Sequence, residues 1–339
     1  MKPMPMYEKQ SRKWPLLFLF STSILIMMMG VICSLKWGQA QVSWRTLLEA
    51  LTYQGSDKAH LYIQTLRLPR AIMACIVGMQ LALAGLLTQL TTKNPLASPH
   101  IFGINAGAAL AVVVGLVALP HFGNIGLIGF AFVGAALSAL LIWSLAGTGR
   151  QQYVRLALAG ITIHFLMSSL TEGFIIMNQH ATDSMIFWLV GSLNQAAWTE
   201  VRIILPFFVG GMVLFSFMLP SFKLLLMDDD IAAGLGQRVN LVRGISILLV
   251  ILLAGSAVAL CGPIGFVCLL VPHMARAMVG NNLTILGPLT ALLGGNLLLY
   301  ADFLSRFIAF PFESPVGIVT SAIGAPYFIY LARKQGGVR

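Results

Sequence analysis

Apolar residues in this chain form long unbroken runs instead of alternating with polar ones. From Asn94 to Gly149 the chain continues for 56 residues without one Asp, Glu, Lys or Arg. A helix needs about 20 apolar residues to cross the hydrocarbon core, so this run predicts two crossings joined by a turn at residues 120–124. Backbone amides in lipid must be bonded within a helix or a closed sheet, and the runs lack the alternation of a membrane barrel. The pattern predicts an all-α, polytopic membrane protein.

Charges, prolines and turn residues divide the chain into ten candidate helices. We expect a single transmembrane domain over residues 14–332, between tails at 1–13 and 333–339. The first apolar range follows basic residues as a signal peptide would, and Gly38-Gln39-Ala40 resembles a weak cleavage site, but its 22 residues exceed the 7–15 of a secretory h-region. We therefore interpret it as a retained helix. The ten ranges are 14–35, 68–90, 101–119, 124–146, 153–177, 202–220, 240–260, 264–279, 283–305 and 314–332.

Ten crossings would leave both termini on one side of the membrane. If that side is cytosolic, the inner segments hold 14 of the 21 Lys and Arg residues, as the positive-inside rule requires. The longest outer segment is then 36–67, where Trp44 to Leu51 predicts a short helix on the membrane surface, and the longest inner loop is 221–239. The net charge of +10 does not indicate nucleic-acid binding, because the basic residues are scattered and build no long basic face.

The chain shows no nucleotide site of its own. A P-loop requires Gly-Lys followed by Ser or Thr, and none of the eight lysines follows a glycine. The four cysteines lie in apolar runs without zinc-ligand spacing, and neither HExxH nor GxSxG is present, which argues against an intramembrane enzyme. We expect no catalytic residue, cofactor or metal, and energy supplied by a partner protein or an ion gradient.

An ion-driven carrier would need carboxylates within the membrane, and the candidates are Glu172 and Asp302. Asp302 can pair with Arg306 one helical turn later, which favours a structural role. His164 lies two turns before Glu172 on the same helical face, so the two could form a proton relay. Alternatively, His164 is a buried imidazole bonded to a carbonyl. A secondary transporter driven by protons or sodium therefore remains an alternative.

The inner loop carries a short acidic helix signal between Asp228 and Gly236. Three consecutive acids suit the positive end of a helix dipole, and glycines can end the helix within two turns. The helix is either a solvated connector or a docking knob for a cytosolic protein.

Several blocks, in order along nearly the whole chain, resemble the permease subunits of ATP-driven importers for iron-siderophore complexes, haem and cobalamin, the FecCD-type permeases. The blocks are Arg67-Leu68-Pro69-Arg70, Asn94-Pro95-Leu96-Ala97 with Gly103, Asp229 with Ala232, Leu235 and Gly236, Gly262-Pro263-Ile264-Gly265-Phe266-Val267, Pro272-His273 with Arg276, Ala301-Asp302 with Arg306, and Pro315-Val316-Gly317 through Gly324-Ala325-Pro326.

The resemblance implies a ten-helix subunit of the bacterial cytoplasmic membrane that pairs with an identical or sister permease, with the translocation path between them. It implies two cytosolic ATP-binding subunits below and an extracytoplasmic binding protein above. The expected substrate is a ferric siderophore complex, with haem or cobalamin as alternatives.

The resemblance also implies two sets of site residues. Asp229, Ala232, Leu235 and Gly236 would couple the subunit to the ATPase, and Arg67 and Arg306 would meet acidic residues of the binding protein at the outer face. At Gly234 this chain departs from the family, which more often has a better helix former there.

Overall fold

The computed structural model describes residues 15–38, 42–55, 57–118, 124–147, 152–178, 188–310 and 312–336. Within these ranges the chain is helical and contains no strand, only an isolated bridge between Ala309 and Phe312. This confirms the predicted all-α class. The helices are α1 (Leu16–Lys36), α2 (Trp44–Leu51), α3 (Lys58–Tyr62), the π-helix η1 (Ile63–Arg67), α4 (Leu68–Thr92), the 3-10 helix η2 (Pro99–Phe102), α5 (Ile104–Ala118), α6 (Asn124–Ala146), α7 (Gln152–Met177), α9 (Trp198–Leu224), α10 (Asp229–Gly234), α11 (Val239–Val250), the π-helix η4 (Ile251–Gly255), α12 (Ser256–Cys261), α13 (Val267–Val279), α14 (Leu283–Ile308) and α15 (Val316–Gly336).

Seven helical segments of the described chain are long and apolar enough to cross a membrane. Three shorter apolar helices accompany them, over Ile104–Ala118, Val267–Val279 and Val316–Tyr330. Together these segments overlap all ten predicted ranges. The number of helices that cross the bilayer stays a prediction, because the shorter ones do not reach the required length alone.

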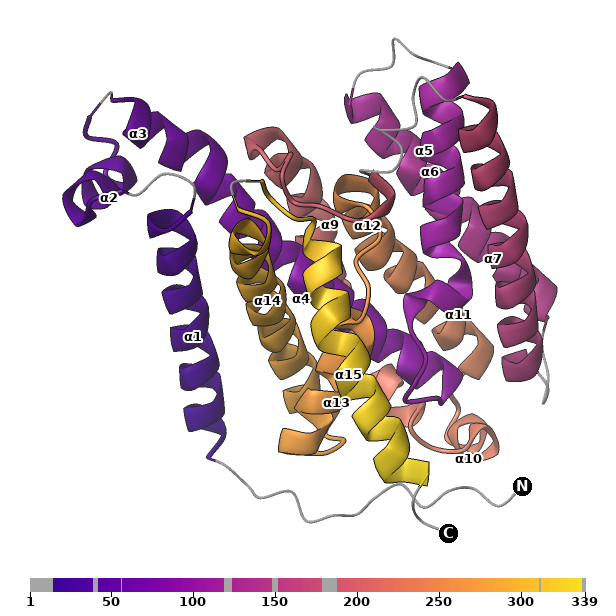
Figure 1. The fold of residues 1–339 in the computed structure, drawn as a ribbon. Helices are drawn as coiled ribbons and strands as arrows, with labels where there is room; N and C mark the ends of the chain where they lie inside the picture. The colour runs from indigo at the N-terminus through magenta and orange to yellow at the C-terminus, as the bar shows by residue number, and fades with distance from the viewer. Residues whose placement is uncertain are drawn as a thin grey trace.

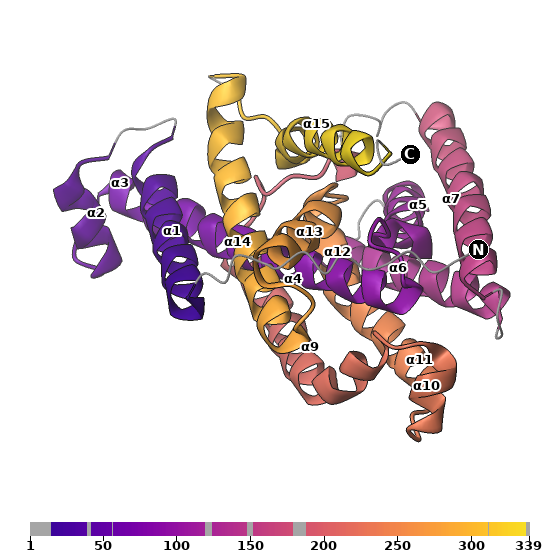
Figure 2. The same ribbon diagram turned by 90° about the horizontal axis from the view of Figure 1, so that it is seen from below.

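Helix α4 lies at the centre of the bundle and packs along α14, which crosses it (Figure 2). A side chain at Gly78 of α4 would collide with the carbonyl oxygen of Gly294 in α14, and one at Gly294 would collide with the carbonyl oxygen of Gly78. Small residues let membrane helices approach this closely and gain contact area. The glycine pair therefore explains the close approach of α4 and α14, while α13, α11 and α9 also pack against the buried α4.

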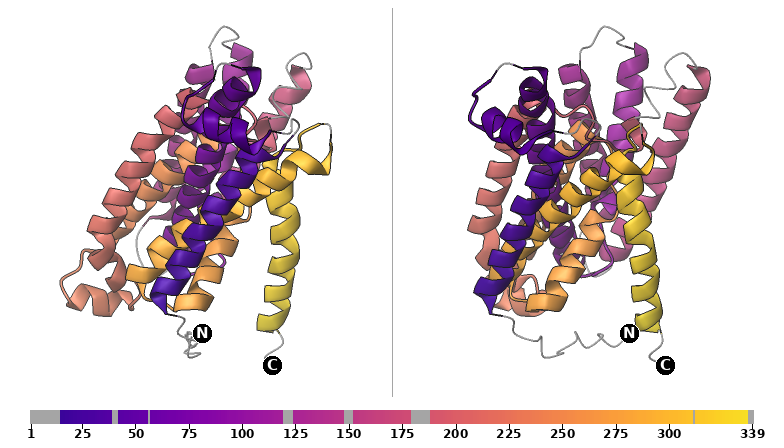
Figure 3. Two further views of the ribbon diagram at one scale, coloured as in Figure 1. Left: turned by 90° about the vertical axis from the view of Figure 1, so that its left-hand side faces the viewer. Right: turned by 60° about the vertical axis from the view of Figure 1, so that its left-hand side comes forward.

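The bundle has two distinct ends (Figure 1). Helix α1 begins and α15 ends at the end that carries α10, which we call the lower end. Helices α2 and α3 and the turn between α14 and α15 lie at the opposite, upper end (Figures 1 and 3). Tail residues 1–13 and 337–339 lie outside the described residues, whereas residues 333–336, predicted to be tail, continue α15.

The helix predicted over Trp44 to Leu51 is confirmed as α2 with those bounds, and its place on the membrane surface stays a prediction. The hydroxyl of Ser43 accepts a hydrogen bond from Thr46 N at 3.1 Å and caps the helix. The range 264–279 is helical only from Val267. Residues before it form a turn in which Phe266 has a φ of +64°. At 1.5 Å per residue, the 13 residues of α13 reach only about 20 Å, less than the hydrocarbon thickness.

Candidate functional site

An ionic clamp at the lower end holds α10 in place. The carboxylate of Asp229 lies 2.9 Å from Lys93 Nζ and 2.7 Å from Arg243 Nη2. Lys93 follows the last turn of α4, and Arg243 lies in the first turns of α11. Lys93 also donates to the carbonyl oxygen of Met227 at 2.6 Å. The clamp therefore links α10 to two long helices of the bundle.

The charge of Asp229 is secured by its neighbours. Partial burial opposes ionisation, but the hydrogen bonds from Lys93 and Arg243 outweigh it and lower the pKa of Asp229 below its ordinary value. The carboxylate therefore stays charged at neutral pH.

The predicted coupling residues Ala232 and Leu235 differ in their exposure to solvent. Ala232 is buried and faces the bundle, whereas Leu235 is 61% exposed. Ile231, one helical turn before Leu235, is 55% exposed and forms an apolar knob with it. The sequence reading missed Ile231, although its spacing of four residues from Leu235 was a usable signal.

Gly236 ends the helix. Its φ is +84°, its N–H donates to Ala233 O at 2.9 Å, and Gln237 N–H donates to Ala232 O at 3.1 Å. This is the Schellman arrangement, which favours glycine in the left-handed region. Gly234, where the chain departs from the family, lies within the helix and has open space beside it.

A second ionic cluster lies at the upper end around Asp302, whose side chain is fully buried. Arg306 Nη2 donates to Asp302 at 2.6 Å, which confirms the predicted pairing one turn apart. Arg70 Nε donates to both carboxylate oxygens at 2.9 and 3.1 Å. Arg70 also donates to Glu313 at 2.5 Å, from the turn before α15.

The sequence led us to expect Arg67 and Arg306 at the outer face. Both lie at the upper end of the bundle, but their side chains are buried. Each is only 3% exposed. Arg67 donates to Leu35 O at 2.6 Å and to Lys36 O at 3.1 Å, and Arg306 donates to Ser34 O at 2.9 Å. Both therefore bond the carbonyl groups that are left without helical partners at the end of α1. The sequence could not show this, because their partners lie about thirty residues or more away along the chain.

A polar cavity of about 160 Å³ adjoins this cluster. We call the charged side chains around it the arginine cluster, which comprises Arg67, Arg70, Arg306, Glu313 and the adjacent Asp302. Three guanidinium groups face two carboxylates, so the arginine cluster carries a net charge of +1. The cavity is further lined by Gly38, Tyr62, Leu66, Asn194 and Ala196.

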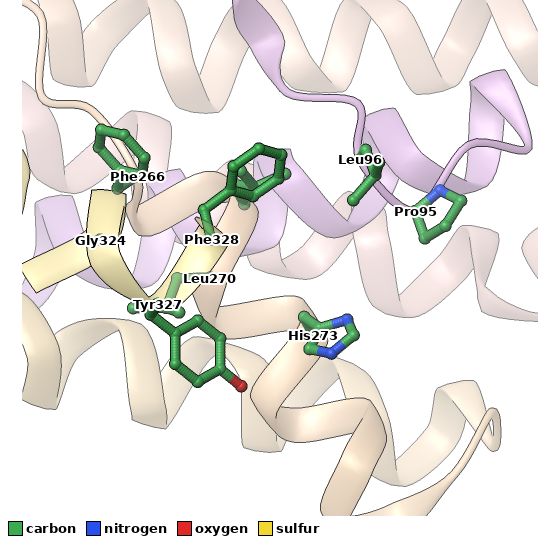
Figure 4. A pocket seen from close by; sticks show the side chains of 9 residues that line it. Pro95, Leu96, Phe266, Leu270, His273, Gly324, Tyr327 and Phe328 are labelled. Carbon is green, nitrogen blue, oxygen red and sulfur yellow. The ribbon is translucent and has the colours of Figure 1, made fainter. Parts of the chain in front are cut away.

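A smaller hollow lies between α13 and α15, beside the turn that holds Pro95 and Leu96 (Figure 4). Phe266, Tyr327 and His273 line it. Its volume of about 10 Å³ is about one water probe. This hollow cannot hold a metal chelate in the present conformation.

The helical bundle and its apolar segments define a multi-pass membrane protein. The chain belongs to the FecCD transport family, whose family model matches residues 25–334. It is 44% identical over 318 residues to the Fe(3+)-citrate import system permease protein YfmD of Bacillus subtilis (strain 168), covering 94% of this chain and 95% of YfmD. It is 36% identical over 331 residues to the permease protein YfmE of the same organism, also named for Fe(3+)-citrate import, covering 96% and 98%.

The fold is similar to a solved structure assigned to the metal-chelate type of ABC transporter, in an inward-facing conformation. The TM-score is 0.83 at 27% identity, and the match covers 94% of this chain and 99% of the other. The family seen in the sequence motifs is thus confirmed.

Proposed function

We propose that this protein is the membrane-spanning subunit of an ABC importer that carries a ferric chelate, of the siderophore or citrate class, into a bacterial cell. The observation that carries the proposal is the near full-length similarity to YfmD. The family model and the fold support the same conclusion.

Ten helical crossings with both termini in the cytosol fit this role. The seven long helices would be joined by α5, α13 and α15, which are shielded in part by their neighbours. Lys93 and Arg243 contact Asp229 of α10, and this side would hold 14 of the 21 Lys and Arg residues of the chain. The positive-inside rule supports placing this end in the cytosol.

The knob of Ile231 and Leu235 suits the attachment of a cytosolic ATP-binding subunit. Two large apolar side chains are exposed at an end where water is expected, and Asp228 and Asp230 lie beside them. An apolar centre with a polar rim is typical of protein interfaces. Through the Asp229 clamp, a push on the knob would reach α4 and α11. The other predicted coupling residues would act from within, Ala232 by packing and Gly236 by ending the helix.

The face of α7 that the bundle leaves exposed supports the presence of a second permease subunit. His164 and Glu172 are both exposed in this helix, which is apolar enough to cross the membrane. Ionisable groups within a membrane almost always face a protein interior or a water-filled path. A partner permease, identical or similar, would cover this face and enclose the path. The shared import-system name of YfmD and YfmE favours a pair of similar permeases.

An extracytoplasmic binding protein would dock at the upper end, over the arginine cluster. Arg67 and Arg306 would then act through the field of the cluster and its cavity, because their side chains are buried. Complementary charge of this kind governs orientation and association rate.

The test is to purify the complex from its native membrane, identify the associated proteins, and assay ATP hydrolysis with the binding protein loaded in turn with ferric citrate, a ferric hydroxamate, haem or cobalamin. We expect an ATPase pair, and stimulation by a ferric chelate. A complex without any ATPase would contradict the proposal, and stimulation by haem or cobalamin alone would overturn the substrate class.

A further inference from the structure

Helix α2 presents three sides of different chemistry. With about 3.6 residues per turn, Leu47 and Ala50 fall on the side that is buried against the bundle. Trp44, Leu48 and Leu51 fall on a second side, where Trp44 is 54% and Leu48 is 64% exposed. The bundle therefore covers only one of the two apolar sides of α2.

The third side of α2 is charged. Arg45 Nε donates to a carboxylate oxygen of Glu49 at 2.8 Å, and the side chain of Arg45 is 89% exposed. Helices that lie in the plane of a membrane interface combine an apolar side toward the lipid with a charged side toward water. The two exposed sides of α2 therefore suit lipid on the apolar side and water on the charged side.

Helix α2 lies at the edge of the bundle, beside the upper end of α1 (Figures 1 and 2). Both views place it on the side opposite α7, so a partner permease that packs against α7 would leave α2 uncovered. The exposed apolar surface of α1 continues to this point, because Ile32 is exposed one turn before Lys36, the last residue of α1. Lipid that covers this side of α1 therefore reaches α2.

Lys36 brings a positive charge to the same place. Its Nζ lies 3.4 Å from the centre of the Trp44 ring and 5.2 Å from that of Trp37, and the two rings pack edge to face with their centres 6.3 Å apart. The face of an indole ring attracts an ammonium group, so the two rings hold Lys36 beside the apolar side of α2. Among the described residues Lys36 has no carboxylate partner, and its N–H groups can therefore donate to an anion from outside the chain.

We propose that Lys36, held between Trp37 and Trp44, binds the phosphate of an anionic phospholipid in the upper leaflet, and that Leu48 and Leu51 insert among the acyl chains of that leaflet. A phospholipid joins a charged headgroup to apolar chains in one molecule, so a cation directly beside an exposed apolar side fits it better than it fits a free phosphate. Tryptophan rings favour this depth of the membrane. The proposal goes beyond the proposed function, because it assigns a lipid site that takes no part in carrying the chelate.

The lipid contact is fixed to the bundle by hydrogen bonds. Gln64 Nε2 donates to Ala50 O at 2.8 Å, and Trp198 Nε1 donates to Gln64 O at 2.8 Å. Arg67 also donates to Lys36 O at 3.1 Å. These bonds connect α2 and the end of α1 to η1 and α9, so the lipid site sets the depth of the upper end of the bundle in the bilayer.

Insertion of α2 is tested with spin labels on the full chain, whose four native cysteines are replaced by Ala, in vesicles of phosphatidylglycerol and phosphatidylcholine. Leu48→Cys carries the label on the apolar side of α2, and Arg45→Cys carries it on the charged side as the matched control. We expect the label at position 48 to meet oxygen more often than a water-soluble nickel complex, and the label at position 45 to show the reverse. Equal or greater access of the nickel complex at position 48 would overturn the insertion.

The headgroup contact is tested on the subunit with its native cysteines. Brominated phosphatidylglycerol is titrated into phosphatidylcholine vesicles, and the part of the tryptophan fluorescence that Trp44→Phe removes reports quenching at the site. Lys36→Gln should raise the lipid content needed for half-quenching about fivefold, the loss expected for one basic side chain at an anionic membrane surface. Lys58→Gln, which removes an exposed lysine of the same outer segment, should shift this content by less than about twofold, because the attraction falls off within a Debye length.

An unchanged half-quenching content in Lys36→Gln would overturn the headgroup site, and an equal shift in Lys58→Gln would show general attraction and overturn it too. Excess inorganic phosphate distinguishes the source of the phosphate group. It should leave the quenching unchanged, whereas loss of the quenching would show that free phosphate, and not lipid, occupies the site at Lys36.

Discussion

Two carboxylates at opposite ends of the bundle are each shared by two cations, but they differ in burial. Asp302 binds Arg70 and Arg306 with no exposure to solvent, whereas the side chain of Asp229, between Lys93 and Arg243, is 40% exposed. A buried ion pair that loses one partner leaves an uncompensated charge, while an exposed pair exchanges its partner for water at little cost. The upper cluster is therefore a fixed anchor. In the lower clamp only the contact between Lys93 and Asp229 is open to water, because Arg243 is buried.

The largest expected effect is on the fixed anchor. Asp302→Asn would leave Arg70 and Arg306 without their shared buried charge, and we expect a loss of about 3–5 kcal/mol in the free energy of unfolding. Thermal unfolding in detergent would measure it. The control is Asp57→Asn, at an exposed position before α3, which should change stability by less than about 0.5 kcal/mol. Similar small losses in both would show that the upper cluster is no anchor.

Opening the lower clamp should affect coupling more than stability. Asp229→Asn is expected to reduce the free energy of unfolding by about 1–3 kcal/mol, because Arg243 is buried. It should lower substrate-stimulated ATP hydrolysis severalfold, because α10 would no longer move with α4 and α11. Asp230→Asn removes the same charge one residue later but leaves the clamp intact, so its loss of stimulation should be clearly smaller than that of Asp229→Asn. Normal stimulation in Asp229→Asn would contradict the clamp.

The end of α10 allows a finer test. Gly236→Ala forces a side chain into a left-handed backbone, which costs about 1–2 kcal/mol, so α10 should fray and ATP stimulation should fall. Gly234→Ala, two residues earlier in the helix with open space beside it, should stabilise α10 by up to about 1 kcal/mol. Hydrogen exchange of residues 229–237 measures both. Equal behaviour of the two variants would refute the assigned role of Gly236.

The smallest effect concerns pH. The folded-state pKa of Asp229 is lowered, so its contribution to stability is fully present above the unfolded pKa of about 3.9 and is lost as the pH falls through the lower folded value. Distances between spin labels on α10 and α13 should therefore be constant from pH 6 to 9 and change only in strong acid. A change near neutral pH would mean that another group holds α10.

Much of this architecture could be predicted because a helix that crosses lipid must be apolar along most of its length. Continuous apolar runs identified all ten helical ranges, and the acids and glycines of residues 228–236 identified α10. The π-helix η1 was missed, and the start of α13 was placed three residues too early, at 264 instead of Val267, because both features depend on tertiary packing and not on periodicity. Their positions matter, since η1 ends at Arg67.

The direction of the charged side chains could be predicted only in part. Sequence spacing paired Asp302 with Arg306 correctly, since both lie on one helix. It could not show that Arg70 joins them from α4, or that Arg67 turns inward to the end of α1. Contacts between distant segments decide which charges are exposed, and these are absent from local patterns.

The most direct test of this account is transport in sealed vesicles. The subunit with its permease partner, ATPases and binding protein should accumulate radioactive ferric chelate only when ATP is supplied on the lower-end side, and the permease subunits without ATPases should accumulate none under a proton or sodium gradient. Gradient-driven accumulation without ATPases, abolished by Glu172→Gln, would contradict the account and identify a secondary transporter.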